Sequence, residues 1–121
     1  MKPVLILCVN DGAEPPTTLA TTATVSTTGN NGISFNGFGY VHGIIFQGGS
    51  GTGGSSGRLN FQSTSPFGWW LESSALRIPH TNIAGFIGIG GTSTAADDQY
   101  LRLSNTVMEF GSTSHSVVVR S

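Results

Sequence analysis

The residues that could perform chemistry are few and widely spaced. The three histidines, His42, His80 and His115, lie far apart in the sequence and lack the spacing of a metal site. Asp97-Asp98 offers oxygen ligands beside a Gly/Ser/Thr-rich segment, but it lacks the alternating acidic pattern of a calcium loop. We therefore predict no metal site and no cofactor, and we expect these side chains to be structural or solvent-exposed.

Catalytic patterns are equally sparse. Glycoside hydrolysis requires two carboxylates within about 10 Å of each other. Glu72 and Glu109 are explained more simply as outward partners of cross-strand arginines, with Arg102 reaching Glu109 diagonally. The glycine-rich segment 85–91 is not followed by a predicted helix that would aim backbone amides at a phosphate. No nucleophile-elbow pattern is present either. We predict no catalytic residues and a protein that is not an enzyme.

The adjacent pair Trp69 and Trp70 has the clearest functional consequence. Alternation along a strand sends one ring to each side of the sheet. We assign Trp69 to the core and Trp70 to the outer face, with Arg77 opposite Trp70 as a cation–π partner. Aromatic and arginine side chains are common interface anchors, and an exposed tryptophan can also stack on a sugar ring. Trp70 and Arg77 are therefore candidates for a subunit interface or, alternatively, for a glycan-binding site; burial of both rings in the core is the remaining alternative.

Strands must position these residues, and their register predicts two hairpins. A two-residue turn at Ser73-Ser74 places Leu71 opposite Leu76, with apolar residues on one side. A turn at Ser104-Asn105 sorts its flanking residues in the same way. The segments 70–78 and 100–112 share this strand–turn–strand shape. Their intervening spacing and residues do not match, so we do not treat them as a repeat.

About ten short strands, turn signals every 8–12 residues and no convincing helix predict an all-β fold. We expect a single antiparallel β-sandwich, jelly-roll-like or barrel-like domain with an extended N-terminal arm; an intertwined trimer is a second all-β possibility. Residues 1–16 would form an N-terminal strand and Pro-rich arm, and residues 17–121 a single β-rich domain. The Gly/Ser stretch 47–57 is interpreted as a surface loop, because the two pieces that it separates are too small to be stable alone.

The N-terminal segment is apolar on both faces. Its apolar run is shorter than that of a signal peptide and lacks a cleavage site, so we expect it to be retained, with Cys8 buried and unreactive. Because Pro15-Pro16 follows as a stiff spacer, we expect residues 1–9 to add to a sheet edge of a neighbouring subunit or virion protein; a place in the sheet of their own chain is the alternative. The candidate interface residues in this segment are Val4, Leu5, Ile6 and Leu7.

Charge is unusually scarce in this chain. Asp, Glu, Lys and Arg make up 9% of the residues, against about 25% in typical soluble domains. An uncharged surface of small and hydroxyl residues is readily packed against other copies, so we predict a homo-oligomer, with a trimer favoured. The net charge of −1 gives no electrostatic basis for binding nucleic acid. No stretch predicts membrane insertion.

The charge-poor hairpin segments, above all Tyr100-Leu-Arg-Leu-Ser-Asn-Thr-Val-Met-Glu-Phe-Gly-Ser112, resemble bacteriophage virion proteins of the tail-fibre and capsid-decoration kind. The resemblance is one of style over residues 17–121. It implies a non-enzymatic, oligomeric structural protein on the virion that binds other virion proteins or a host surface glycan. The chain departs from some fibre tips in having no glycine-repeat shaft and no His-x-His array. The alternatives are a glycan-binding β-sandwich, viral or extracellular, and a subunit of a cell-surface filament.

Overall fold

The computed structural model describes residues 2–29, 31–49, 58–61, 67–81, 85–90 and 99–120. Within these ranges the chain forms β-strands and no helix, so the all-β prediction is confirmed. β-Branched and aromatic residues favour the strands, and Gly, Ser and Asn end them. In chain order the strands are β1 (Val4–Leu7), β2 (Ala23–Ser26), β3 (Ile33–Ser34), β4 (Phe38–His42), β5 (Ile44–Gln47), β6 (Arg58–Phe61), β7 (Phe67–Glu72), β8 (Ala75–Ile78), β9 (Phe86–Gly90), β10 (Gln99–Ser104), β11 (Val107–Phe110) and β12 (Ser116–Arg120).

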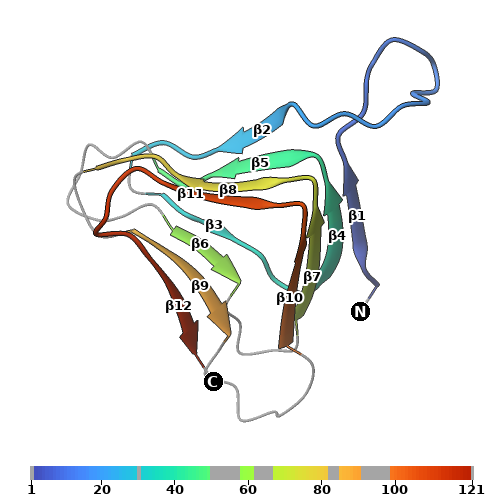
Figure 1. Cartoon of the computed structure of the whole chain (residues 1–121). Coiled ribbons are helices and arrows are strands. Elements are labelled where there is room, and N and C mark those ends of the chain that lie inside the picture. Colours follow the sequence, from blue (N-terminus) through green and yellow to red (C-terminus); the bar gives the residue numbers. More distant parts are fainter. Residues whose placement is uncertain are drawn as a thin grey trace.

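The strands wind into three parallel sheets (Figure 1). The first face has the order β1-β4-β7-β10, the second β11-β8-β5-β2 and the third β12-β9-β6-β3. Each strand therefore pairs with the strand three places away in the chain, and each pairing is parallel. Three successive strands make one coil, and the stacked coils form a three-sided parallel β-solenoid.

The predicted antiparallel β-sandwich, jelly roll or barrel is wrong. β7 and β8, which we expected to pair around Ser73-Ser74, lie in different sheets, and so do β10 and β11. Leu71 pairs with Val41 and Leu103 of the neighbouring coils rather than with Leu76. Hairpins and stacked coils both alternate inward and outward residues with a period of two, so the alternation alone could not distinguish them.

The core consists of columns of apolar side chains inside the solenoid. Because the parallel strands are in register, inward residues at equivalent positions lie above one another, as Val41 and Leu71 do. Both are completely buried. Aromatic rings add to this packing: Phe35 stacks on Phe61 with ring centroids 4.1 Å apart and meets Trp69 edge-on at 5.4 Å. Each column therefore binds successive coils together through apolar contact.

The corner between the first and second faces is built from residues with positive φ. They are Gly43, Ser73 and Asn105, with φ values of 75°, 49° and 46°. The Gly43 amide donates to the Glu72 carbonyl at 3.1 Å, and the Ser73 amide donates to the Ser104 carbonyl at 3.0 Å. The hydrogen-bond ladder thus continues around the turn. The two sites that we predicted to be hairpin turns are these solenoid corners.

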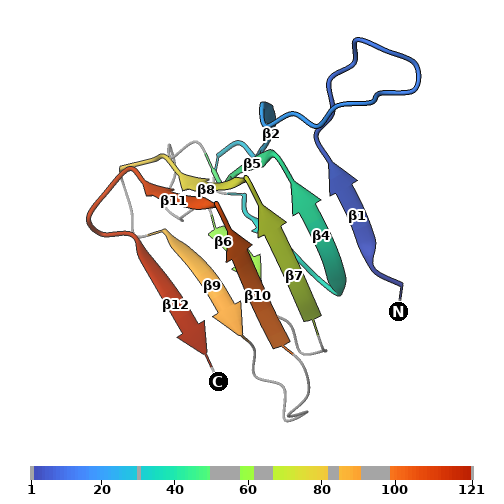
Figure 2. The same cartoon turned by 45° about the vertical axis from the view of Figure 1, so that its right-hand side comes forward.

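The first coil has a much longer connection at the same corner. Residues 8–22, here called the excursion, leave the body after β1 and return to β2, as Figure 2 shows. An antiparallel bridge between Val9 and Leu19 holds its base together. A Cβ at Gly43 would overlap the carbonyl oxygen of Ala20, so only glycine fits where the excursion returns.

The N-terminal strand is part of the solenoid rather than an extended arm. β1 pairs in parallel with β4 of its own chain, from Val4 beside Gly39 to Leu7 beside His42. Residues 4–7 therefore add to a sheet of their own chain, whereas we expected a neighbouring subunit or virion protein; contact of the free edge of β1 with another subunit stays a prediction. The burial of Cys8 is confirmed. Residues 50–57 of the predicted Gly/Ser loop lie outside the described residues, so that loop stays a prediction.

Candidate functional site on the first face

The outer side of the first face carries a ladder of aromatic residues. Parallel register places Tyr40 of β4 beside Trp70 of β7, and Trp70 beside Arg102 of β10. The rings of Tyr40 and Trp70 meet edge-on, with centroids 5.2 Å apart. The Arg102 guanidinium lies 4.2 Å from the centroid of the Trp70 ring, within the range of a cation–π interaction. These side chains form a continuous row along the solenoid axis.

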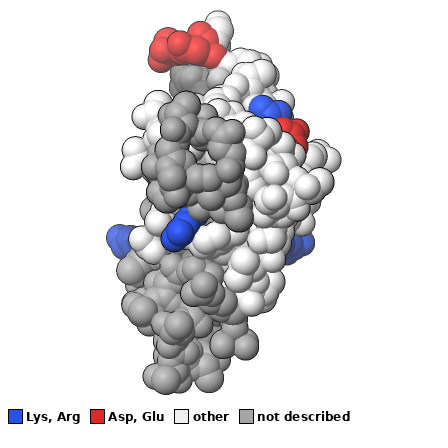
Figure 3. All heavy atoms as spheres, turned by 90° about the vertical axis from the view of Figure 1, so that its left-hand side faces the viewer, with Lys and Arg blue, Asp and Glu red and all other residues white. Residues whose placement is uncertain are grey.

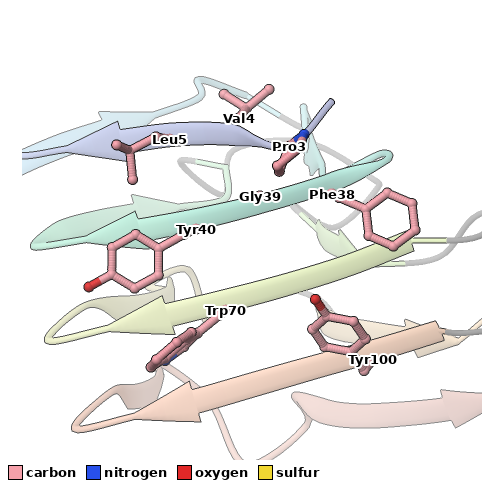
Figure 4. Close-up of a pocket in the computed structure, with 8 residues that line it drawn as sticks. All are labelled: Pro3, Val4, Leu5, Phe38, Gly39, Tyr40, Trp70 and Tyr100. Carbon is pink, nitrogen blue, oxygen red and sulfur yellow. The ribbon is translucent and has the colours of Figure 1, made fainter. Parts of the chain in front are cut away.

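A shallow groove of about 250 Å³ lies along this row. Its lining combines aromatic side chains of β4, β7 and β10 with aliphatic residues of the N-terminal segment. Figure 4 shows the rings of Tyr40, Trp70 and Tyr100 projecting from three neighbouring strands on the same side of the sheet. We call this feature the aromatic groove; its lining residues are Pro3, Val4, Leu5, Phe38, Gly39, Tyr40, Trp70 and Tyr100.

Two glycines determine where the large rings can lie. A Cβ at Gly68 would overlap the ring of Tyr100, so the Tyr100 side chain lies across the β7 backbone on the outer side. On the inner side, a Cβ at Gly39 would overlap the ring of Trp69. Each glycine thus provides space for an aromatic ring on the neighbouring strand, one outside the solenoid and one inside.

Polar groups border the groove. The Tyr40 hydroxyl donates a hydrogen bond to the Glu72 carboxylate at 2.5 Å. This hydrogen bond raises the pKa of Tyr40 above 10.0, and burial and the negative charge of Glu72 raise it further. Glu72 lies beside His42 on the outer side of the same sheet. The site therefore offers flat apolar rings with a carboxylate, phenols and a guanidinium at its margin.

Trp69 and Trp70 occupy the sides that the sequence predicted. Trp69 is 5% exposed in the core, and Trp70 is half-buried on the outer side. The predicted partner of Trp70 is wrong, because Arg77 lies on the second face and forms an ion pair with Glu109. Arg102, which we had paired with Glu109, contacts Trp70 instead.

Sequence reasoning missed most of the groove. Tyr40, Phe38 and Tyr100 were not singled out, although each contributes to its lining. The available signal was recurrence of aromatic residues about 30 positions apart in segments of similar shape, as in Tyr40 and Trp70. Glu72, predicted to pair with an arginine, instead accepts the Tyr40 hydrogen bond.

The other candidate residues are distributed as follows. Among the described residues, no group of three or more His, Cys, Asp or Glu side chains is arranged to hold a metal ion. His80 and His115 lie together, with ring centroids 4.6 Å apart, and both are buried. Glu72 and Glu109 lie on different sheets. Asp97 and Asp98 fall outside the described residues.

The described part of the chain contains no helix long and apolar enough to cross a membrane.

No family model, curated protein or solved structure matches this chain. The resemblance to bacteriophage virion proteins stays a prediction from the sequence.

Proposed function

We propose that this protein is a glycan-binding β-solenoid that holds a carbohydrate chain in the aromatic groove. The supporting observation is the row formed by Tyr40, Trp70 and Arg102 on neighbouring strands, with Tyr100 beside it. A sugar ring has an apolar C–H face that packs on an aromatic ring and hydroxyls that require hydrogen-bond partners. Binding sites commonly combine such apolar walls with a few placed polar groups.

The dimensions of the groove suit an extended ligand. Neighbouring strands in a sheet are about 4.7–4.9 Å apart, and the groove is lined by residues from β1, β4, β7 and β10. A linear oligosaccharide lying along the solenoid axis would pass the rings of Tyr40 and Trp70 in turn. Glu72, Arg102 and the Tyr100 hydroxyl would then form hydrogen bonds with the hydroxyl groups of the oligosaccharide.

The charge distribution favours a neutral ligand over a nucleic acid. The chain has a net charge of −1, which gives no general attraction for phosphates. Figure 3 shows the side of the molecule turned away from the first face, where the described Lys and Arg side chains form no continuous basic patch. A neutral polyhydroxylated chain requires no compensating charge, so the net charge of −1 does not oppose its binding.

The test is binding of neutral oligosaccharides on a glycan array, followed by calorimetry with the best ligand. Trp70→Ala should weaken binding at least about tenfold, because aromatic anchors typically contribute more than 1 kcal/mol. Arg77→Ala is the matched control, since Arg77 lies on the second face and should leave affinity unchanged. Absence of glycan binding, or equal effects of the two variants, would contradict the proposal.

The second candidate function is structural: a non-enzymatic decoration or tail-fibre-like component that assembles as an oligomer on a virus particle, with an extracellular or cell-surface location as the alternative. Large apolar side chains exposed at both ends of the solenoid favour assembly, with Leu5 65% and Val119 72% exposed. This role is compatible with glycan binding, since a virion protein can contact a host surface. Co-purification with intact virus particles tests it, and consistent absence from them would contradict it.

A further inference from the structure

The solenoid has two ends, and each presents unpaired strand edges. β1, β2 and β3 form one end, and β10, β11 and β12 form the other. In Figure 2, β1 and β12 lie on opposite sides of the molecule, with no described strand beyond either. An edge strand leaves a row of backbone N–H and C=O groups available for another strand.

Both ends also expose side chains that belong to the core columns. At the first end, Ile6 and Val25 are 37% and 46% exposed, although their registered neighbours Val41 and Phe46 are buried. At the other end, Val117 is 41% exposed beside the buried Ile87. These side chains point toward the solenoid interior but have a coil on only one side. Each end is therefore a cross-section through an apolar core.

The two cross-sections match each other face by face. One column runs Ile6–Val41–Leu71–Leu103 on the first face, a second runs Val25–Phe46–Leu76–Met108, and a third runs Ile33–Leu59–Ile87–Val117. In all three columns the members at both ends are apolar. A second copy displaced along the axis would place an apolar residue on an apolar residue in every column.

We propose that copies of this chain stack head to tail, with the β10–β12 end of one copy on the β1–β3 end of the next. Each face then continues as a parallel sheet, because every strand keeps its direction and its face. Contact between two identical ends would pair strands in opposite directions. It would also set strands of two different faces over one another, because a twofold axis across a three-sided end exchanges two of the faces.

The excursion does not close the first end. It leaves from the corner after β1, and all four residues of β1 remain exposed. The contact is heterologous, so each copy retains one free end and assembly continues into a linear stack. This inference is independent of glycan binding, since the aromatic groove is on the outer side of the first face.

The experiment blocks one end at a time. Val25→Lys places a charge in the core column of the second face at the first end. Val119→Lys places one at the other end, where Val119 lies beside Ile89 on the same inward side of β12 as Val117. Thr24→Lys is the matched control, because Thr24 is exposed on the same edge strand but points outward beside Ile45. Burying an unpaired charge should weaken stacking at least about a hundredfold. Sedimentation velocity over a concentration series measures the sizes, and circular dichroism checks that each variant is folded.

The native protein and Thr24→Lys should grow in size with concentration, whereas each blocked variant alone should remain monomeric. A mixture of Val25→Lys with Val119→Lys should form a dimer with one copy of each, and nothing larger, because each supplies the end that the other lacks.

A monomeric native protein at millimolar concentration would overturn the proposal. So would a Val119→Lys protein that still dimerises, since that indicates contact between two first ends. Glycan affinity of the blocked variants should equal that of the native protein, so the two proposals can fail separately.

Discussion

Trp69 and Trp70 are neighbours in the sequence and have the same side chain, yet they lie in opposite environments. Trp69 is enclosed in the core, where its ring meets Phe35 and occupies the space left by Gly39. Trp70 lies outside, between Tyr40 and Arg102. The inner ring is enclosed by the core, whereas the outer ring keeps a side open to solvent. The comparison indicates that the inner side of the first face holds the fold together and the outer side is available for binding.

The largest expected effect is on the inner side. Trp69→Ala should lower the free energy of unfolding by about 3–5 kcal/mol, because it leaves a cavity among rings that cannot collapse to fill it. Trp70→Ala should lower the free energy of unfolding much less, since the Trp70 ring is only partly buried. Chemical denaturation of both variants measures the difference. Equal losses would show that the outer ring also supports the fold.

Gly39 and Gly68 distinguish the inner and outer sides of the first face in a second way. Gly39→Ala forces a methyl group into the buried Trp69 ring and should destabilise the protein by about 1–3 kcal/mol. Gly68→Ala meets the ring of Tyr100, which is 51% exposed and can swing toward solvent. Thermal unfolding should therefore change little for Gly68→Ala, while glycan affinity and the near-ultraviolet circular dichroism of the aromatic groove change. The reverse order of thermal effects would contradict the assignment of inner and outer sides.

A smaller effect is expected at the outward ion pair of the second face. Arg77 and Glu109 face each other from β8 and β11, with side chains 35% and 47% exposed. Because solvent screens such pairs, Arg77→Ala should lower the free energy of unfolding by about 0.2–1 kcal/mol, and added salt should reduce that loss. Chemical denaturation at low and high salt measures the loss. A salt-independent loss would mean that Arg77 contributes through packing rather than charge.

The smallest effect concerns alkaline pH. The pKa of Tyr40 is raised in the folded protein by its hydrogen bond to Glu72, then by burial and by the charge of Glu72. The stability that this provides is fully present below the unfolded pKa of about 10. It is lost as the pH rises through the folded pKa, because the unfolded chain ionises first. Tyr40→Phe should therefore flatten the fall in stability above pH 10, and Tyr100→Phe is the control. Identical pH profiles for native protein and Tyr40→Phe would contradict this coupling.

The sequence was sufficient to predict strands, their alternation and the opposite sides of Trp69 and Trp70. It was insufficient for strand pairing, because Ser73-Ser74 suits a hairpin turn as well as a solenoid corner. Of these two serines only Ser73 adopts positive φ, and the chain turns onto a new sheet rather than back along β7. Local turn chemistry does not specify which of these occurs.

The missed signal was the similarity of segments 70–78 and 100–112. In the structure they are successive coils, with Arg102 beside Trp70 and Phe110 beside Ile78. We rejected a repeat because the connecting residues differ, yet in a solenoid the strands carry the register and the connections are free to vary. The aromatic groove depends on that register, so it could not be assembled without the correct pairing.

The corner between the first and second faces has a consequence for how such a protein can change length. The second coil turns there through the single residue Gly43, and the third turns through Ser73 and Ser74, whereas the first accommodates the whole excursion of residues 8–22. Strands on both faces nevertheless remain in register across these coils. The register of the two faces therefore does not depend on the length of the connection at this corner. A peptide, or a complete folded domain with adjacent termini, inserted in the exposed part of the excursion at residues 11–17 would be displayed outward without breaking the hydrogen bonds of the corner.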